Sequence, residues 1–178
     1  MPMSADLSPV IASTAQWLLR AYPATGGALD TALAQAQAQQ AATVAAWLRY
    51  PTAADAALLA LVGPGGSERL DWLTGAEAVD ATEPEEAWRS WVDEVVASWA
   101  ACLLTVPVLA DTAVAALTKT EHLADLPLDF RRLTSPDARD RRAATLLRHP
   151  DLPAPIADLH RASLLHHLQD DDLNAACA

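Results

Sequence analysis

The chain has 178 residues, of which 52% are hydrophobic and 20% are charged, and this balance excludes an extended disordered chain. Its formal net charge is −11, with a single lysine among 12 basic residues, which argues against general nucleic-acid binding because that needs clustered Lys and Arg. The 40 Ala and 27 Leu greatly outnumber the 10 Val and 2 Ile, so helix-forming residues dominate strand-forming ones. We therefore predict an all-α fold in which residues 1–178 form one domain, a compact bundle of about six to eight helices.

The N-terminal part of the chain predicts two helices, over residues 9–21 and 28–49. Ser8 and Pro9 form a typical helix start, a capping side chain followed by proline at the first helical position. The four glutamines of the second helix are spread around it, so we expect no binding surface there. The residues expected on the buried faces are Val10, Thr14, Trp17 and Leu18 in the first helix and Leu29, Leu33, Ala36, Val44 and Trp47 in the second.

Two short helical segments are predicted over residues 52–62 and 67–75, on either side of a glycine-rich loop. The loop, residues 63–67, has the sequence Gly-Pro-Gly-Gly-Ser and is the candidate hinge of the domain. It does not predict phosphate binding, because no Gly-Lys-Ser/Thr follows and no strand precedes it.

The strongest helix signal covers residues 83–106 and predicts a central, Trp-rich helix. Acidic residues in its first turn suit the helix dipole, and apolar residues follow at near-heptad spacing. The apolar run 95–110 is shorter than the roughly 20 residues that span a bilayer, so we expect no membrane insertion. Pro107 either kinks this helix or starts the next one, over 108–118. The expected core residues are Trp91, Val95, Trp99, Cys102 and Leu103.

The C-terminal third predicts an extended connection over 125–130, a basic helix over 135–148 and a last helix over 154–169. A run of three Asp, residues 170–172, follows at the C-terminal end of the last helix, where negative charge is unfavourable. We therefore expect a frayed tail over 170–178.

A weak repeat appears at three helix ends, which close on Pro23, Pro51 and Pro150 after an arginine and a ring-bearing residue. Trp17 and Trp47, which begin two of them, are 30 residues apart, a spacing found in helical repeat proteins. Segment 148–153 also resembles one unit of a leucine-rich-variant repeat, although no array follows. A short helical-repeat scaffold is one interpretation, and a shared way of ending helices is the other.

No pattern in the sequence defines a catalytic, cofactor or metal site. His160 and His167 share one face of the last predicted helix, but the paired His or Cys of a zinc site are missing, so we expect no metal and no cofactor. Cys102 lies among apolar residues, which keep a thiol protonated and unreactive. Glu86 and Asp93 share a helix face with an arginine between them and predict a salt-bridged surface.

Charge gathers in two blocks of opposite sign. Residues 68–94 hold nine acidic residues and two Arg, and residues 131–148 hold six Arg and two Asp. The two blocks either dock on each other or receive a partner, and the sequence leaves both interpretations open.

The sequence favours a binding protein over an enzyme. Its acidic block contains aromatic residues at positions where they are often partly exposed, and the sequence shows no set of residues typical of a catalytic site. Trp88 stands at a helix start among acids, which is the arrangement of an apolar anchor inside a polar rim. We predict a protein–protein interaction module of adaptor, chaperone or inhibitor type, whose partner has a basic surface. Two cysteines and the absence of a signal-peptide pattern indicate a reducing cytoplasm. The predicted partner-binding residues are Asp71, Trp72, Glu85, Glu86 and Trp88.

Two alternatives to the interaction module remain open from the sequence. One is an enzyme or enzyme accessory subunit whose site is formed by residues distant in the chain. The other is the short helical-repeat scaffold.

Overall fold

The computed structural model describes residues 7–50, 88–120 and 129–176, and these contain seven helices and no strand. The predicted all-α fold is therefore confirmed. Predicted elements within 51–87, among them the candidate hinge at 63–67, lie outside the described residues. The helices are α1 (Ser8–Ala21), α2 (Ala28–Arg49), α5 (Trp88–Thr105), α6 (Pro107–Leu117), α7 (Arg131–Thr134), α8 (Ala138–Ala143) and α9 (Ala154–Ala176).

The two N-terminal helices lie where the sequence predicts them to within one residue, but α1 begins at Ser8, so its N-cap is Leu7 and the predicted cap at Ser8 is wrong. Pro107 starts a helix instead of kinking one. Val106 is extended, with φ −120° and ψ 95°, and Pro107 follows at the first position of α6, where its missing N–H is not needed. A residue before proline is pushed out of the helical region, so the break between α5 and α6 is a local effect of the sequence.

The structure corrects two predictions for the C-terminal third. The predicted basic helix over 135–148 is the shorter α8 followed by turns. Most of the stretch predicted as extended, residues 125–130, lies outside the described residues, and the sequence did not predict α7, which follows it. Helix α9 continues past its predicted end to Ala176 and so includes most of the segment 170–178 that was expected to fray. His166 Nδ1 lies 2.7 Å from Asp170 Oδ2 one turn along the helix, a contact that links the segment predicted to fray to the turn before it.

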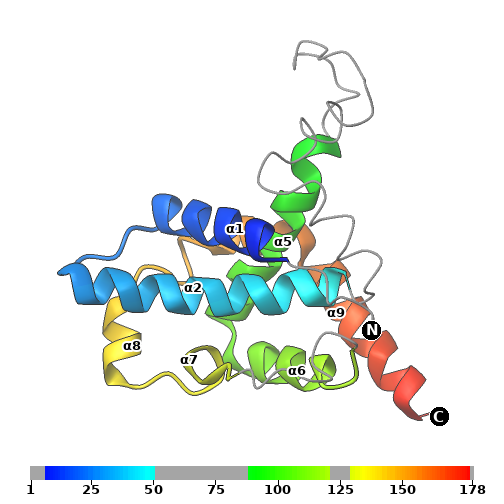
Figure 1. Cartoon of the computed structure of the whole chain (residues 1–178). Helices are drawn as coiled ribbons and strands as arrows, with labels where there is room; N and C mark the ends of the chain where they lie inside the picture. The colour runs from blue at the N-terminus through cyan, green and yellow to red at the C-terminus, as the bar shows by residue number, and fades with distance from the viewer. Residues whose placement is uncertain (1–6, 51–87, 121–128, 177–178) are drawn as a thin grey trace.

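Helix α2 runs through the middle of the bundle and packs against α1, α5, α6, α7 and α8 (Figure 1). Its buried side is mostly alanine, and small side chains let several neighbours approach closely. Val44 and Trp47 are buried as predicted, but Leu29 is 64% exposed while Ala34 and Ala38 are fully buried. The positions of the larger apolar residues predicted the wrong buried face for the N-terminal half of α2, because the sides of an alanine-rich helix differ little in hydrophobicity.

Helix α5 is the second central element and packs against α1, α2, α6 and α9. The expected core residues Val95, Trp99, Cys102 and Leu103 are all at most 2% exposed, so this part of the prediction is confirmed. The side chain of Trp91, the fifth expected core residue, lies outside the described part of the chain.

The Cys102 thiol links α5 to α9, because its Sγ donates a hydrogen bond to the Ala157 carbonyl of α9 at 3.2 Å. Burial raises the pKa of this thiol above its ordinary value. Cys102 is therefore a small core residue, as predicted, and its environment does not activate it as a nucleophile.

A buried carboxylate, that of Asp140, ties α7 to α8. Its side chain is 2% exposed, accepts a hydrogen bond from Arg131 Nη2 at 2.9 Å and lies 3.3 Å from Arg132 Nε. It also accepts from the backbone N–H of Asp137 at 3.2 Å, and the Asp137 carboxylate accepts from the N–H groups of Asp140 and Arg139 in return. These backbone hydrogen bonds hold the pKa of Asp137 below its ordinary value.

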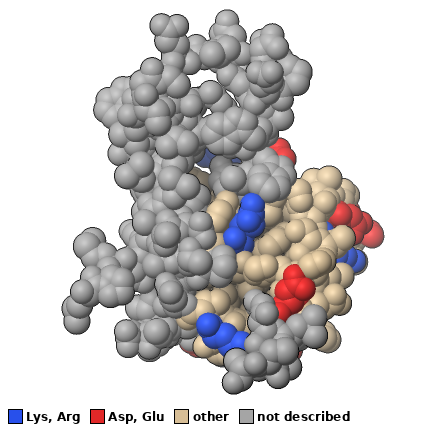
Figure 2. Space-filling model, turned by 90° about the vertical axis from the view of Figure 1, so that its right-hand side faces the viewer, with Lys and Arg blue, Asp and Glu red and all other residues tan. Residues whose placement is uncertain are grey.

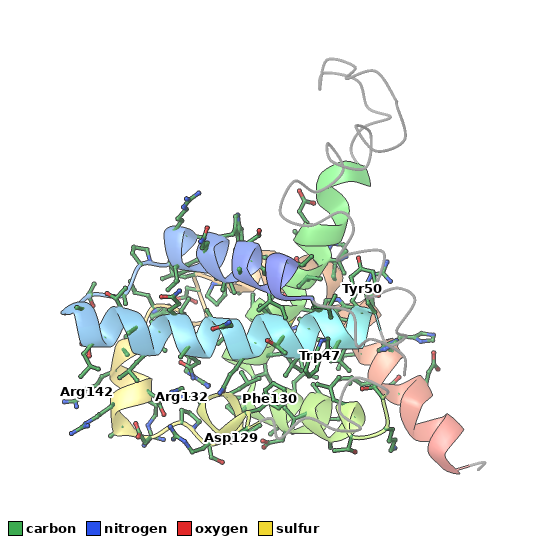
Figure 3. All side chains as sticks on the ribbon, in the orientation of Figure 1. Trp47, Tyr50, Asp129, Phe130, Arg132 and Arg142 are labelled. Atoms are coloured by element: carbon green, nitrogen blue, oxygen red, sulfur yellow. The ribbon has the colours of Figure 1, made fainter. Side chains whose placement is uncertain are left out.

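Two glutamines of α2 hydrogen-bond to the backbone of α7 and of the residues just before it; Figure 3 labels two of the partner residues, Asp129 and Arg132. Gln37 Nε2 donates to the Arg132 carbonyl at 2.6 Å, and Gln40 Nε2 donates to the Asp129 carbonyl at 2.9 Å. Gln40 Oε1 accepts from the backbone N–H of Leu133 at 3.0 Å. The prediction that these glutamines form no binding surface misses this internal role, because their partners lie 89 to 95 residues away.

The repeated pattern at helix ends reflects how two helices stop. Tyr22 and Tyr50 follow α1 and α2 with nearly the same φ and ψ, −133° and 70° against −125° and 74°, and each N–H donates to a carbonyl at 2.8 Å. In a repeat array each unit contacts only its neighbours, whereas here α2 contacts α8 and α5 contacts α9. The described part of the chain is therefore a bundle and not a stack of repeats.

We expect Trp99→Ala to lower the free energy of unfolding by about 3–5 kcal/mol, because it deletes a large aromatic side chain that is 2% exposed. The matched control is Val108→Ala, which shortens a side chain that is 74% exposed and should change the free energy by less than about 0.5 kcal/mol. Urea unfolding followed by circular dichroism measures both. Equal stability of Trp99→Ala and the wild type would mean that the buried face of α5 is wrongly assigned.

We expect Asp140→Ala to cost about 2–3 kcal/mol, because it removes a buried carboxylate that joins two helices. The loss stays below that of a fully buried pair, since the side chains of Arg131 and Arg132 are 41% and 37% exposed and water can solvate them. Asp151→Ala, at a side chain that is 86% exposed, is the control and should leave the unfolding midpoint in urea unchanged. If both variants unfold at the same midpoint, α7 and α8 do not depend on this carboxylate.

Candidate functional site

Of the predicted acidic surface, residues 68–94, the structure describes the C-terminal end. Trp88 is the first residue of α5, but its side chain is not described. Glu94, the last acid of the block, is exposed and lines a groove. The other predicted partner-binding residues lie outside the described part and stay predictions: Asp71, Trp72, Glu85 and Glu86.

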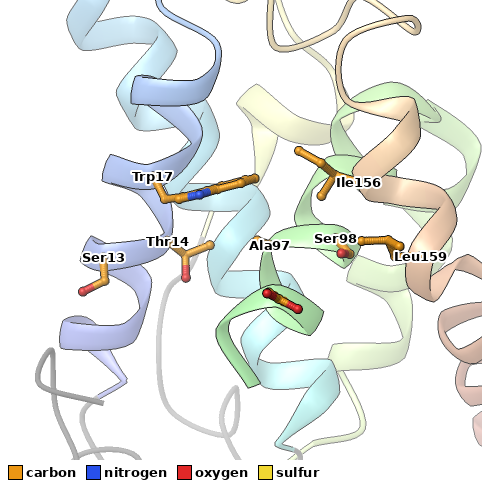
Figure 4. A pocket seen from close by; sticks show the side chains of 8 residues that line it. Ser13, Thr14, Trp17, Ala97, Ser98, Ile156 and Leu159 are labelled. Carbon is orange, nitrogen blue, oxygen red and sulfur yellow. The ribbon is translucent and has the colours of Figure 1, made fainter. Parts of the chain in front are cut away.

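The groove next to Glu94 has α5 as its floor and α1 and α9 as its walls (Figure 4). Its volume is about 520 Å³. The Trp17 indole of α1 points across it toward Ile156 of α9, and Leu159 lies one turn further along α9. Trp17 and Leu159 are 42% and 66% exposed, so apolar surface from two helices distant in the sequence meets solvent in one concavity.

The position of Trp17 differs from the sequence prediction, which places it in the core. Val10, Thr14 and Leu18 of the same predicted face are buried. At 100° per residue, Trp17 falls at the edge of the arc that these residues define, on the side of the half-buried Ser13. A helical wheel contains this signal, but only the position of α9 shows that the edge opens onto a groove.

Two hydroxyl groups lie at the base of the groove. Thr14 is 4% exposed, and Ser98 is fully buried with no hydrogen-bond partner for its Oγ. A buried hydroxyl without a partner costs about 1–3 kcal/mol, and such groups are uncommon in folded proteins. Ser98 is thus an unpaired hydroxyl buried in the floor of the groove.

Tyr22 fixes the distance between the two walls of the groove. Its hydroxyl donates to the Leu152 carbonyl at 2.9 Å, which ties the end of α1 to the turn that leads into α9. Its ring meets the Trp17 ring edge-on, with centroids 6.5 Å apart and planes at 85°. Burial raises the pKa of the Tyr22 phenol above its ordinary value.

The strip of α9 that lines the groove continues along the helix into a second concavity. Ile156, Leu159, Ser163, His166 and Asp170 follow one another at spacings of three and four residues and so share one side of the helix. The strip is apolar where it faces the groove and polar where it faces the second concavity.

The second concavity is a pocket of about 550 Å³ at the end of α2, bounded also by α5 and α9. Arg49, the last residue of α2, lines it together with Trp99 of α5. His160 and His167 also line it, so the two histidines that the sequence places on one face do meet in one pocket. The His167 ring lies against Trp99, with centroids 5.8 Å apart.

Three of the six arginines in block 131–148 make contacts within the described bundle. Arg131 and Arg132 pair with Asp140, and the Arg148 guanidinium donates to the Leu133 carbonyl at 3.0 Å. The acids between residues 68 and 87 are not described, so docking of the block on them stays a prediction. On the described part of the face in Figure 2, charged side chains of both signs lie singly and form no patch of one sign. The exposed members of the block are Arg139, Arg141 and Arg142.

Within the described ranges, no group of three or more His, Cys, Asp or Glu is placed to hold a metal ion. No helix there is long and apolar enough to cross a membrane. Comparisons with known proteins found no matching family model, no similar curated protein and no similar solved structure. Function has to be inferred from the residues and their geometry.

We expect Tyr22→Phe to lower the free energy of unfolding by about 1 kcal/mol near neutral pH, because it removes one hydrogen bond and keeps the ring. The folded-state pKa of the phenol is raised, so its contribution is complete below the ordinary value of 10.0 and is lost as the pH rises through the folded-state pKa. Urea unfolding of both proteins should therefore show their difference shrinking above pH 10. A difference that grows with pH would contradict the assigned hydrogen bond.

Proposed function

We propose that this protein is a helical protein–protein interaction module that binds a basic amphipathic helix of its partner in the groove between α1, α5 and α9. The observation that carries the proposal is the Trp17 indole, 42% exposed, which points across an open groove toward the apolar side chains of α9. Adaptor, chaperone and inhibitor roles all require such a surface.

The apolar part of the groove suits the anchoring side chains of an amphipathic helix. Trp is enriched among residues that dominate binding energy, and Trp17 and Leu159 expose surface that a bound apolar face would cover. A helix that docks in a groove places apolar residues at spacings of three and four along one side, which matches a channel bounded by two helices.

The charge of the protein favours a basic partner. Glu94 is the ionisable residue among the described residues that line the groove, and the chain as a whole carries −11. Glu94 also ends the acidic block 68–94, and the first turns of α5 extend beyond α1 (Figure 1). The predicted surface around Trp88 would then continue the groove along α5, where negative charge would speed the encounter with a basic helix.

The proposal includes a cytoplasmic location. Its support is the scarcity of cysteine and the free, buried thiol of Cys102, both common in proteins of reducing compartments.

We expect a photoreactive amino acid at position 17 or 159 to crosslink one defined protein in the source cells, because both positions face the groove. The controls are positions 29 and 108, whose side chains are 64% and 74% exposed and do not line it. Crosslinked products separated by gel electrophoresis and identified by mass spectrometry give the result.

The affinity of the partner so identified provides the quantitative test. Trp17→Ala should weaken binding at least about 10-fold, whereas Leu29→Ala should leave it unchanged. Adducts that appear equally at positions 17, 29 and 108, or an unchanged affinity of Trp17→Ala, would contradict the proposed function. Adducts only with small molecules would favour the enzyme interpretation instead.

A further inference from the structure

We propose that the exposed arginines of α8 form a second interaction surface, which binds an acidic segment of a partner protein. The surface consists of Arg139, Arg141 and Arg142, and we call it the arginine surface. Helices α1 and α8 pack against different sides of α2, so the arginine surface lies apart from the groove that the proposed function uses (Figure 1). It lies at the left of Figure 1 and is therefore on the far side of the molecule in Figure 2.

The three arginines occupy the side of α8 that does not pack on the bundle. Asp140 and Ala143, which are each 2% exposed, mark the buried side of this helix. At 100° per residue, the arginines fall within an arc of about 160° on the other side. Figure 3 shows Arg142 at the outer edge of the bundle. A partner can therefore reach all three side chains without a change in the fold.

The guanidinium groups of the arginine surface form no hydrogen bond or ion pair in the described part of the chain. The acids nearest in sequence have other contacts. Asp140 pairs with Arg131 and Arg132, while Asp137 accepts N–H groups of α8 and lies 3.9 Å from Arg131 Nη1. The surface therefore carries three positive charges that the described bundle leaves unpaired.

The positive charges of this region are close enough to repel one another. The pKa of Arg148 is held below its ordinary value, first because the side chain is partly buried and second because the charge of Arg141 lies nearby. Repulsion between like charges destabilises a fold, and a basic cluster is unusual in a chain whose net charge is −11. A partner of opposite charge would offset this repulsion, which is what a binding surface requires.

Carboxylates suit the arginine surface better than nucleic acid does. The planar guanidinium group binds a carboxylate through two parallel hydrogen bonds. Nucleic acid needs many phosphate contacts, and a chain with 23 acidic and 12 basic residues repels so dense a negative charge. Helix α8 has the sequence Ala-Arg-Asp-Arg-Arg-Ala, which contains no aromatic ring on which a base could stack. A protein segment with a few Asp or Glu residues is therefore the partner that this surface fits.

The first test uses the full-length wild-type protein and a fluorescein-labelled peptide of alternating Glu and Ala residues, with fluorescence anisotropy as the measurement. We expect saturable binding that weakens as salt is added, because the contacts join exposed charges. The same peptide with Gln in place of Glu should not bind. Equal binding of the two peptides would overturn the proposal. Binding of a DNA oligonucleotide or of phosphatidylserine vesicles without binding of the Glu peptide would also overturn it, and would assign the surface to that class of ligand.

The second test removes two charges from the arginine surface. Arg141→Gln combined with Arg142→Gln should weaken binding of the Glu peptide at least about 10-fold. The matched control combines Arg20→Gln with Lys119→Gln, which removes two positive charges from exposed side chains outside α8. The control should bind nearly as tightly as the wild type. An equal loss of affinity in both proteins would show that net charge alone matters and would overturn the proposal.

The stability of the arginine double variant separates a binding role from a structural one. Its unfolding midpoint in urea should not fall below that of the wild type, because neither side chain has a described partner and one repulsion is removed. A lower midpoint would show that these arginines stabilise the fold and would overturn the proposal. Trp17→Ala should leave binding of the Glu peptide unchanged, so a failure of the arginine surface and a failure of the groove are distinguishable.

Discussion

Close packing around an alanine-rich helix is the constraint on which the rest of this structure depends. Ala34, Ala38, Ala41 and Ala45 of α2 are fully buried, and five other helices pack against α2. Such contacts are possible because a methyl side chain lets backbones approach closely, but each alanine contributes little apolar area. The larger side chains of neighbouring helices, such as Trp99 of α5, supply the volume that fills the remaining space.

The same shortage of apolar area explains why polar contacts hold the short helices. Helices α7 and α8 have 4 and 6 residues, which is too few to form a stable helix without tertiary support. Gln37 and Gln40 bind the backbone of α7, and Asp140 joins it to α8 through Arg131 and Arg132. Most polar atoms of this cluster pair with each other, but the buried Gln37 Oε1 has no hydrogen-bond partner and Arg132 Nε reaches Asp140 only as an ion pair, so part of the desolvation cost remains.

Helix α9 connects the structural and functional arguments for this protein. Its buried side, with Ala157, Leu164 and Leu168, packs in the core. Its partly open side changes from apolar residues beside Trp17 to histidines beside Arg49, and so it borders two concavities of different chemistry.

Local sequence was enough to define the helical class and the bounds of α1 and α2 to within one residue, and it limited Pro107 to a kink or a helix start, because propensities and proline act within a few residues. It also identified Trp99 and Cys102 as core residues, since a long apolar periodicity marks one side of α5. Tertiary contacts decided the buried side of α2, the existence of α7 and the exposure of Trp17. Each of these depends on a partner far away in the chain: the glutamines of α2 bind α7 across 89 to 95 residues, and Trp17 faces a wall formed by α9. Periodicity within one helix shows which residues can be buried, but the neighbouring helices determine which of them are.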